Sequence, residues 1–477
     1  MSVVSAGASP PSRQETTSDG GGAPAGPAAG MQGAGVDIKA FIDARPISAF
    51  QWFLVAMCFL VVVADGMDVA IMGFVTPSIL QEWDISRPAF GIVISAAPFG
   101  LVIGALVAGP SSDRFGRKAV LTVSVLLFGL LTLATAYASS PTEMAVLRLL
   151  AGMGMGAAMP NATTLLSEYA PQRRRSLMIT VMFTGFNLGS ALIGFAAGYL
   201  IPLHGWRSVL VLGGAVPLLL VPVLVLFLPE SARLLALRGA GSERIAATLG
   251  RVTGHRFPGG ETFVSAEPPL QARTPIGVLF SRGFGMTTLS LWVTYFMGLL
   301  VIYLLTGWLP TIMKDAGLSI ATAANVTAMF QIGGTVGAIA VGWTMDRARP
   351  ALVIGAAYLG GALCVLALSQ LGVLSPALAL LVFAAGFCMS GAQTGLNAYA
   401  PGCYPTAARA TGVSWMLGVG RFGSIVGSSV GGALLGLGWG FGAILAILAI
   451  PAVSAAAAIA ATQLGRSGTA TAEAVAH

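Results

Sequence analysis

The sequence predicts an all-α integral membrane protein with twelve transmembrane helices in two pseudo-symmetric halves. Of its 477 residues, 56% are hydrophobic and only 9% are charged, and the mean hydropathy is +0.84. Soluble domains carry about 25% charged residues, so this composition excludes a soluble globular protein. Apolar segments of roughly 20 residues, the length of a bilayer-spanning helix, recur from Gln51 to Ala461. A membrane β-barrel would instead show short alternating strands.

Twelve segments meet this length. They are approximately 52–78, 90–110, 119–138, 143–166, 177–200, 208–228, 285–312, 320–344, 351–371, 376–399, 410–435 and 440–463. They form an N-terminal six-helix half over 46–228 and a C-terminal half over 285–463. A linker loop over 229–284 joins the halves, and its stretch "ESARLLALRGAGSERIAATL" predicts short surface helices. Residues 1–45 are rich in Gly, Ala, Pro and Ser and predict a disordered tail, while 464–477 are the C-terminal tail.

The orientation follows from the positive charges. On this segmentation, 20 of the 25 Lys and Arg residues fall on the side that holds both termini and the linker. Three fall on the other side and two lie within membrane segments. Positive loops stay in the cytoplasm, so we expect a multi-pass protein of the inner (plasma) membrane with both termini cytoplasmic. The formal charge of +7 reflects this topology, and a nucleic-acid partner is not needed to explain it.

The two halves repeat each other in sequence. In "GPSSDRFGRKAV", which starts at Gly109, the Gly, Asp and Arg recur 233 residues later in "GWTMDRARPALV". "YAPQRRRSLMITVMFTGFNLGS" aligns with "CYPTAARATGVSWMLGVGRFGS" at an offset of 234. Pro77, expected to end the first helix, recurs as Pro310. Parallel halves of this kind are typical of transporters whose substrate site lies near mid-membrane between the halves.

These motifs resemble a known family. "GPSSDRFGRK" is similar to the loop signature of the major facilitator superfamily, and "PESARLL" resembles the element after helix 6 in its sugar-porter-like branches. "DGMD", "RLLAGMGMGAAMPNATTLLSEYAP" and "YPTAARATGVSWMLGVGRFGS" resemble the aromatic acid:proton symporter family within it. The resemblance covers most of residues 45–463. It implies the major facilitator fold and transport by alternating access.

A cytoplasmic gating motif follows from the repeat and the resemblance together. Its members are Gly109, Asp113, Arg114, Gly116, Arg117, Asp346, Arg347, Glu168, Arg175, Arg409 and Glu230. Because Asp113 and Asp346 occur in both halves, we interpret them as loop clamps rather than substrate contacts. The repeat counterpart of Glu168 is Gly402, so the C-terminal cluster is expected to lack one acid.

Four charges within the membrane segments are not explained by the repeat. They are Asp65, Asp68, Arg148 and Arg421, whose counterparts are Gly298, Val301, Leu381 and Asn187. A charge at this depth costs about 2.5–3.5 kcal/mol on insertion scales and is kept where it pairs, faces a cavity or works. The two acids are three residues apart, hence on one helix face. They could bind and release protons, or they could cap a kink at the intervening glycine and pair permanently with arginine.

The resemblance assigns proton coupling to Asp68 and Arg148, with Asp65 as the extra acid of the aromatic-acid family. Arg421 suits a substrate carboxylate because its planar fork stays charged, although a neighbouring helix could also satisfy it. Its counterpart Asn187 should face the same cavity. Further candidates for the substrate site are Tyr303, Gln331, Gln393 and Asn397. Rings such as Tyr295 could stack on a benzene ring, but each is also explained by helix packing.

Two Asp and two Arg sum to zero, so a bound monoanion leaves the cavity at −1 and at least one proton restores neutrality. We therefore predict a monomeric proton-coupled symporter for an aromatic carboxylate resembling hydroxybenzoate. Alternatives are a porter for another small organic acid or a sugar, a drug:proton exporter, or a membrane receptor for aromatic acids. No metal cluster, nucleophile–base pair or nucleotide motif suggests an enzyme, and no cofactor beyond protons is expected.

Overall fold

All twelve predicted spans coincide with long helices. In this computed structural model we describe residues 35–264, 279–280, 284–404 and 406–475. The helices of the first half are α2 (Ala49–Trp83), α3 (Arg87–Phe115), α4 (Arg117–Thr135), α5 (Pro141–Tyr169), α6 (Arg175–His204) and α7 (Trp206–Phe227). Those of the second half are α10 (Gly285–Asp315), α11 (Ile320–Met345), α12 (Pro350–Leu371), α13 (Leu378–Tyr399), α14 (Thr406–Gly436) and α15 (Phe441–Val475). A short 3-10 turn, η2 (Ala400–Cys403), precedes α14.

Ten of these helices, counted within the described residues, are long and apolar enough to cross a bilayer. The other two, α5 and α14, are rich in Gly, Ser and Thr, which lowers their hydropathy. Both lie inside the bundle: α5 packs on α3 and α4, and α14 packs on α10 and α3. The two helices that carry Arg148 and Arg421 thus each pack against several helices of the bundle.

The predicted end of the first helix at Pro77 is wrong. Helix α2 continues through Pro77 to Trp83, and α10 likewise continues through Pro310 to Asp315. Neighbouring helices in a membrane bundle tolerate such prolines because side-chain hydroxyls and local adjustments satisfy the freed backbone groups. The neighbouring Thr76 donates its hydroxyl hydrogen to the carbonyl of Met72, one turn back in the same helix.

The sequence repeat is also a repeat in packing. Gly189 of α6 lies against the backbone of Val63 in α2, and Gly423 of α14 lies in the same way against Phe296 in α10. The α3–α5 contact runs over Gly100 and Gly104, and the α11–α13 contact runs over their counterparts, Gly333 and Gly337. At each of these glycines an added Cβ would overlap a backbone carbonyl oxygen of the partner helix. Small residues allow this backbone approach, which drives helix association in lipid.

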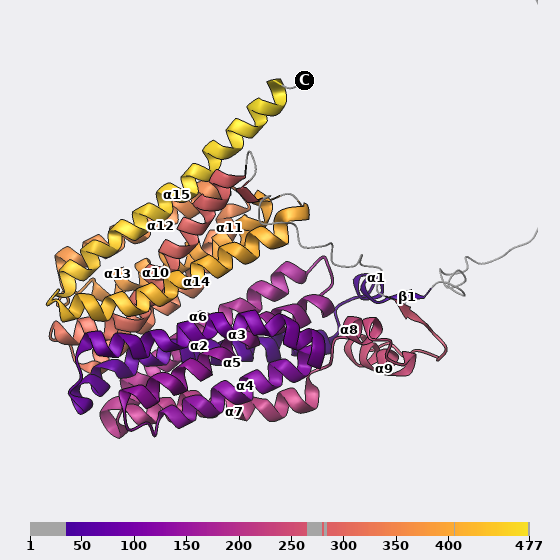
Figure 1. The fold of residues 1–477 in the computed structure, drawn as a ribbon, viewed down its shortest axis with the longest axis horizontal. Coiled ribbons are helices and arrows are strands. Elements are labelled where there is room, and N and C mark those ends of the chain that lie inside the picture. The colour runs from indigo at the N-terminus through magenta and orange to yellow at the C-terminus, as the bar shows by residue number, and fades with distance from the viewer. Residues whose placement is uncertain (1–34, 265–278, 281–283, 405, 476–477) are drawn as a thin grey trace, which may run out of the picture.

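The halves form two bundles that lie side by side, one indigo to magenta and one orange to yellow (Figure 1). They meet through α2 with α10, α3 with α14 and α6 with α11. At one end Arg87, which begins α3, makes a 2.8 Å ion pair with Asp315 at the end of α10. Deeper in the same region the hydroxyls of Ser95 and Ser429 lie 2.7 Å apart. These contacts join the halves at the end where α2 and α10 finish.

The opposite end, here named the capped end, carries a small subdomain on the first half (Figure 1). It consists of β1 (Val36–Asp37), α1 (Ile38–Asp43), α8 (Ala232–Leu237), α9 (Ser242–Thr253) and β2 (Phe263–Val264). Strands β1 and β2 pair in parallel, and Phe41 packs against His255 and Phe257. Ser48 begins α2 with a capping box to Gln51.

The capped end confirms the predicted linker helices and corrects part of the predicted N-terminal tail. The two linker helices predicted from "ESARLLALRGAGSERIAATL" are confirmed as α8 and α9. The disordered tail predicted over 1–45 is wrong for residues 35–45, because they form β1 and α1 and pack on the linker. Residues 1–34 lie outside the described part. At the other terminus α15 runs to Val475, into the predicted tail.

Candidate functional site

A buried ion pair joins α2 to α5. Nη2 of Arg148 lies 2.8 Å from Oδ2 of Asp68, and Nη1 lies 2.9 Å from Oδ1. Nη2 also donates to the backbone oxygen of Asp68 at 3.0 Å. Neither side chain has any exposed surface. The expected contact between these two residues is confirmed. Such a buried, bidentate pair is strong only while both partners stay charged, since either charge alone is costly at this depth.

Thr132 of α4 is a third member of this pair. Its hydroxyl donates to Oδ1 of Asp68, and Nη1 of Arg148 lies 3.3 Å from the same hydroxyl oxygen. The Thr132 side chain is fully buried. Thr132 was not predicted as a site residue, because an isolated threonine in a membrane helix does not indicate a functional role. Most bond to their own helix, as Thr135 does to the carbonyl of Leu131.

Asp65 has a different environment one turn nearer the capped end. It is 2% exposed, and its Oδ1 has no hydrogen-bond partner among the described residues. The charges that act on it are those of Arg421, from the other half, and Asp68. Helix α2 continues through Gly66, which packs against the backbone of Phe186, and of the two acids only Asp68 makes an ion pair with arginine among the described residues. A buried carboxylate oxygen without a partner is costly, so this position favours binding a proton or a ligand.

Arg421 of α14 faces Asp65 across the interface between the halves. Its guanidinium lies beside the hydroxyl of Tyr303 in α10 and interacts electrostatically with Tyr303, Tyr295 and Asp65. Tyr303 and Tyr295 are 8% and 7% exposed. No carboxylate of the described residues lies within ion-pair distance of Arg421. Its planar donor fork therefore keeps capacity for an anion.

Two of the other predicted site residues gather near Arg421. The hydroxyl of Tyr295 lies beside the side chains of Gln393 and Asn397, one turn apart on α13. The remaining two lie elsewhere: Nε2 of Gln331 donates to Thr306 at 3.2 Å, and Asn187 faces Gly334 of α11. We expected Asn187 to face the same cavity as Arg421. Among the described residues no contact joins their side chains, so this remains a prediction.

A small cavity lies between Arg148 and Tyr303, the tyrosine beside Arg421. It is lined by α2, α3, α5, α10 and α14, and its polar lining includes Arg148, Tyr303, Thr306 and Ser428. Its volume is about 20 Å³, enough for a water molecule. A water in this cavity could hydrogen-bond to both Arg148 and the hydroxyl of Tyr303. A benzene ring does not fit this space, so this cavity is not itself the substrate site.

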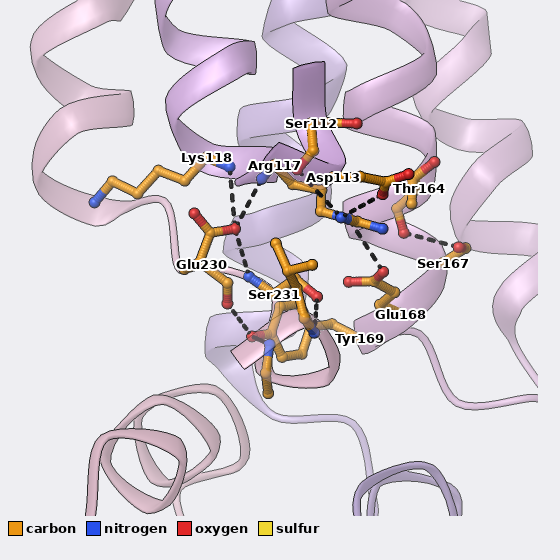
Figure 2. Close-up of polar contacts among 12 residues, drawn as sticks. Ser112, Asp113, Arg117, Lys118, Thr164, Ser167, Glu168, Tyr169, Glu230 and Ser231 are labelled. Carbon is orange, nitrogen blue, oxygen red and sulfur yellow. Dashed lines mark hydrogen bonds and ion pairs between the residues drawn. The ribbon is translucent and has the colours of Figure 1, made fainter. Parts of the chain in front are cut away.

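At the capped end, the gating residues of the first half form one polar cluster (Figure 2). Arg117 lies 3.1 Å from Asp113 and 3.5 Å from Glu168. Oε1 of Glu230 accepts the backbone N–H groups of Arg117, Lys118 and the following Ser231, at 2.9, 3.3 and 2.9 Å. Glu230 therefore caps the N-terminus of α4, where the helix dipole favours a negative charge.

Two features complete this cluster. Gly116 has φ +101°, a conformation that favours glycine, and an added Cβ would overlap the carboxylate of Glu230. Tyr169 donates its hydroxyl hydrogen to the carbonyl of Glu230 and accepts the N–H of Ala232 at 2.9 Å (Figure 2). The cluster thus ties the linker to α4 and α5. Gly109 is exposed, and its carbonyl accepts the hydroxyl of Ser112 at 3.0 Å.

The second half has a weaker counterpart. Arg347 donates to the carbonyl of Trp343 at 3.0 Å and stacks over its ring, and Asp346 makes no ion pair with any described side chain. Arg175 is the first residue of α6, and the side chain of Arg409 lies outside the described part.

The structure has two parallel six-helix halves, with a polar cluster at the capped end. Four charged residues lie in the middle of the bundle: Asp65, Asp68, Arg148 and Arg421. This architecture is that of a membrane transporter. The family model of the Major Facilitator Superfamily matches residues 58–377 and, in a second overlapping match, residues 291–473. The chain belongs to the Major Facilitator Superfamily.

Curated relatives narrow the comparison. The chain is 59% identical over 405 residues to a "Gallate transporter" of Pseudomonas putida, a match that covers 85% of this chain and 90% of the relative. It is 51% identical over 412 residues to the "4-hydroxybenzoate transporter PcaK" of Pseudomonas aeruginosa, covering 86% of this chain and 92% of the relative. Among solved structures, the fold is similar to that of a D-xylose-proton symporter. The TM-score is 0.67 at 17% identity, and the match covers 86% of this chain and 97% of the other.

Proposed function

We propose that the protein imports an aromatic carboxylate together with protons across the inner membrane by alternating access. The names of the relatives supply the substrate class. The observation that carries the proposal is the mid-membrane arrangement. Arg421 makes no ion pair among the described residues, and it faces Asp65, whose Oδ1 lacks a hydrogen-bond partner. One group can accept an anion and the other a proton, and they come from opposite halves.

Charge balance favours carrying both together. Asp68 and Arg148 neutralise each other in a closed pair, which leaves Asp65 and Arg421 as the pair that a substrate can separate. A carboxylate that binds Arg421 neutralises the positive charge that otherwise acts on Asp65. Protonation of an acid in the site then restores neutrality, and the loaded site crosses without net charge.

The orientation is also part of the proposal. The capped end, which carries most of the positive loops, is cytoplasmic, and both termini lie on that side. The ion pair between Arg87 and Asp315 then closes the outer end of the transport path. The protein acts as a monomer, because each monomer contains both halves of the path. The substrate leaves chemically unchanged.

Uptake into proteoliposomes with an imposed pH gradient tests this function. Labelled benzoate, 4-hydroxybenzoate, gallate, a non-aromatic acid and xylose should separate the substrate classes, and chromatography of the contents checks that the substrate is unaltered. We expect accumulation of aromatic acids only. Accumulation of the sugar or of the non-aromatic acid instead would support the porter alternatives, and binding without uptake would support a receptor.

The role of Arg421 is tested by Arg421→Ala, with Arg207→Ala as the matched control because Arg207 pairs with Glu82 at the far end of the bundle. We expect Arg421→Ala to lower the affinity for aromatic acids at least tenfold by calorimetry, since a buried charged hydrogen-bond pair is lost. Unchanged affinity would make Arg421 a structural residue.

A further inference from the structure

Tyr358 of α12 fixes the amide of Gln393 in α13. The tyrosine hydroxyl lies 2.7 Å from Oε1 of Gln393, and the two side chains are 0% and 7% exposed. Because the hydroxyl donates to the amide oxygen, the amide nitrogen must point elsewhere with both its hydrogens. Nε2 of Gln393 is buried and makes no hydrogen bond of ordinary geometry among the described residues. This oriented donor makes no hydrogen bond that meets the geometric limits within the described part of the chain, although the hydroxyl of Tyr295 lies beside it.

This pair occupies a particular place in the repeat. It packs over Gly298 of α10, where an added Cβ would overlap both Oε1 of Gln393 and the hydroxyl of Tyr358. Gly298 is the repeat counterpart of Asp65. At equivalent positions, the first half has an acid and the second half has a neutral amide held over a glycine. The two halves thus present different chemistry to the same mid-membrane region.

The amide is buried close to the proposed substrate site, on a face of α13 whose next turn is exposed. Tyr295, which lies beside Gln393, also interacts electrostatically with Arg421. Asn397, one turn along α13 toward the capped end, is exposed. A ligand that enters from that end and places its carboxylate at Arg421 can therefore direct its ring toward Tyr295 and Gln393. A substituent on the ring would then meet the unused amide nitrogen.

We propose that Gln393, held by Tyr358, recognises a hydroxyl group on the aromatic ring of the substrate. This inference rests on the proposed function and refines it: the preferred substrates are hydroxylated aromatic acids, and Tyr358 is a positioning residue for specificity. The oxygen of a ring hydroxyl accepts the buried N–H, whereas an unsubstituted ring leaves that donor without a partner. Sites built to hydrogen-bond a substrate hydroxyl discriminate strongly against analogues that lack it.

Calorimetry with purified protein tests the inference, using benzoate, 4-hydroxybenzoate and gallate as probes. We expect the wild type to bind at least one hydroxylated acid tenfold or more tightly than benzoate. Gln393→Leu should abolish most of this preference, and an unchanged size-exclusion profile and thermal unfolding curve show that the variant is folded. Tyr358→Phe should reduce the preference severalfold, since the amide is then free to rotate. Tyr404→Phe is the matched control, because it removes a buried hydroxyl that contacts Thr288, outside this cluster.

The outcomes separate the inference from the function beneath it. If the wild type binds all three acids equally, or if Gln393→Leu weakens all three by the same factor, the recognition of a ring hydroxyl by Gln393 is overturned and aromatic acid transport stands. If Tyr358→Phe leaves the preference intact, the positioning role of Tyr358 is overturned. If the wild type binds none of the acids, the inference and the proposed function fail together.

Discussion

Replacing Asp68 by asparagine should separate proton coupling from substrate movement, because the family resemblance assigns proton coupling to the pair of Asp68 and Arg148. The substitution keeps the size of the side chain but removes the charge opposite Arg148. In the structure the carboxylate accepts two hydrogen bonds from Arg148, at 2.8 and 2.9 Å, and one from Thr132. An asparagine can keep one acceptor oxygen, but its NH₂ group would face a donor of Arg148 or Thr132.

The expected loss of stability follows from burial. Both side chains of the ion pair are fully buried, so Asp68→Asn leaves the guanidinium of Arg148 without a counter-charge. Breaking such a pair typically costs about 3–5 kcal/mol of unfolding free energy. The double variant Asp68→Asn/Arg148→Gln removes both charges and should regain much of that loss. If stability is regained but coupling is not, the lost coupling cannot be attributed to misfolding.

The assay compares two modes of transport in proteoliposomes. If one monoanion moves with one proton, the step is electroneutral, and a gradient of one pH unit supports at most about tenfold accumulation of substrate. We expect the wild type to approach this limit and to be insensitive to membrane potential. Asp68→Asn should exchange labelled for unlabelled substrate without accumulating it. Gradient-driven accumulation that persists in this variant would refute the assignment of Asp68 to proton coupling.

Three further predictions concern other parts of the molecule. Thr132→Val should lower stability by about 1 kcal/mol in thermal unfolding, because its buried hydrogen bond to Asp68 is lost, whereas Thr132→Ser keeps the hydroxyl and the stability; equal stability of the two variants would exclude this role. Glu230→Ala should lower stability by about 1–2 kcal/mol through loss of the cap on α4, measured by thermal unfolding in detergent, with the exposed Glu243→Ala as the control. Gly337→Leu should prevent close packing of α11 on α13 and reduce the yield of folded protein on size-exclusion chromatography; a normal yield would contradict the packing argument.

Much of the architecture could be predicted from the sequence because it depends on local patterns. Apolar length determines which segments become helices in a bilayer, and the repeat of Gly, Asp and Arg at an offset of 233 revealed the two halves. The same repeat identified the charges without counterparts, and the contact between Asp68 and Arg148 followed from their helices being neighbours in the family that the sequence resembles. The order within residues 35–45 was not predictable, since β1 exists only through pairing with β2, more than 200 residues later.

The sequence by itself determined the class of fold, the presence of four membrane charges and the residues of the gating cluster. The tertiary structure decided how these groups divide: Asp68 is closed in a pair that Thr132 completes, and Asp65 keeps an oxygen free opposite Arg421. It also showed that Gln331 bonds to Thr306 whereas Gln393 is held by Tyr358. The reason is physical, because hydrogen bonds between helices depend on their rotation and depth, and those are set by packing across the whole bundle rather than by any one segment.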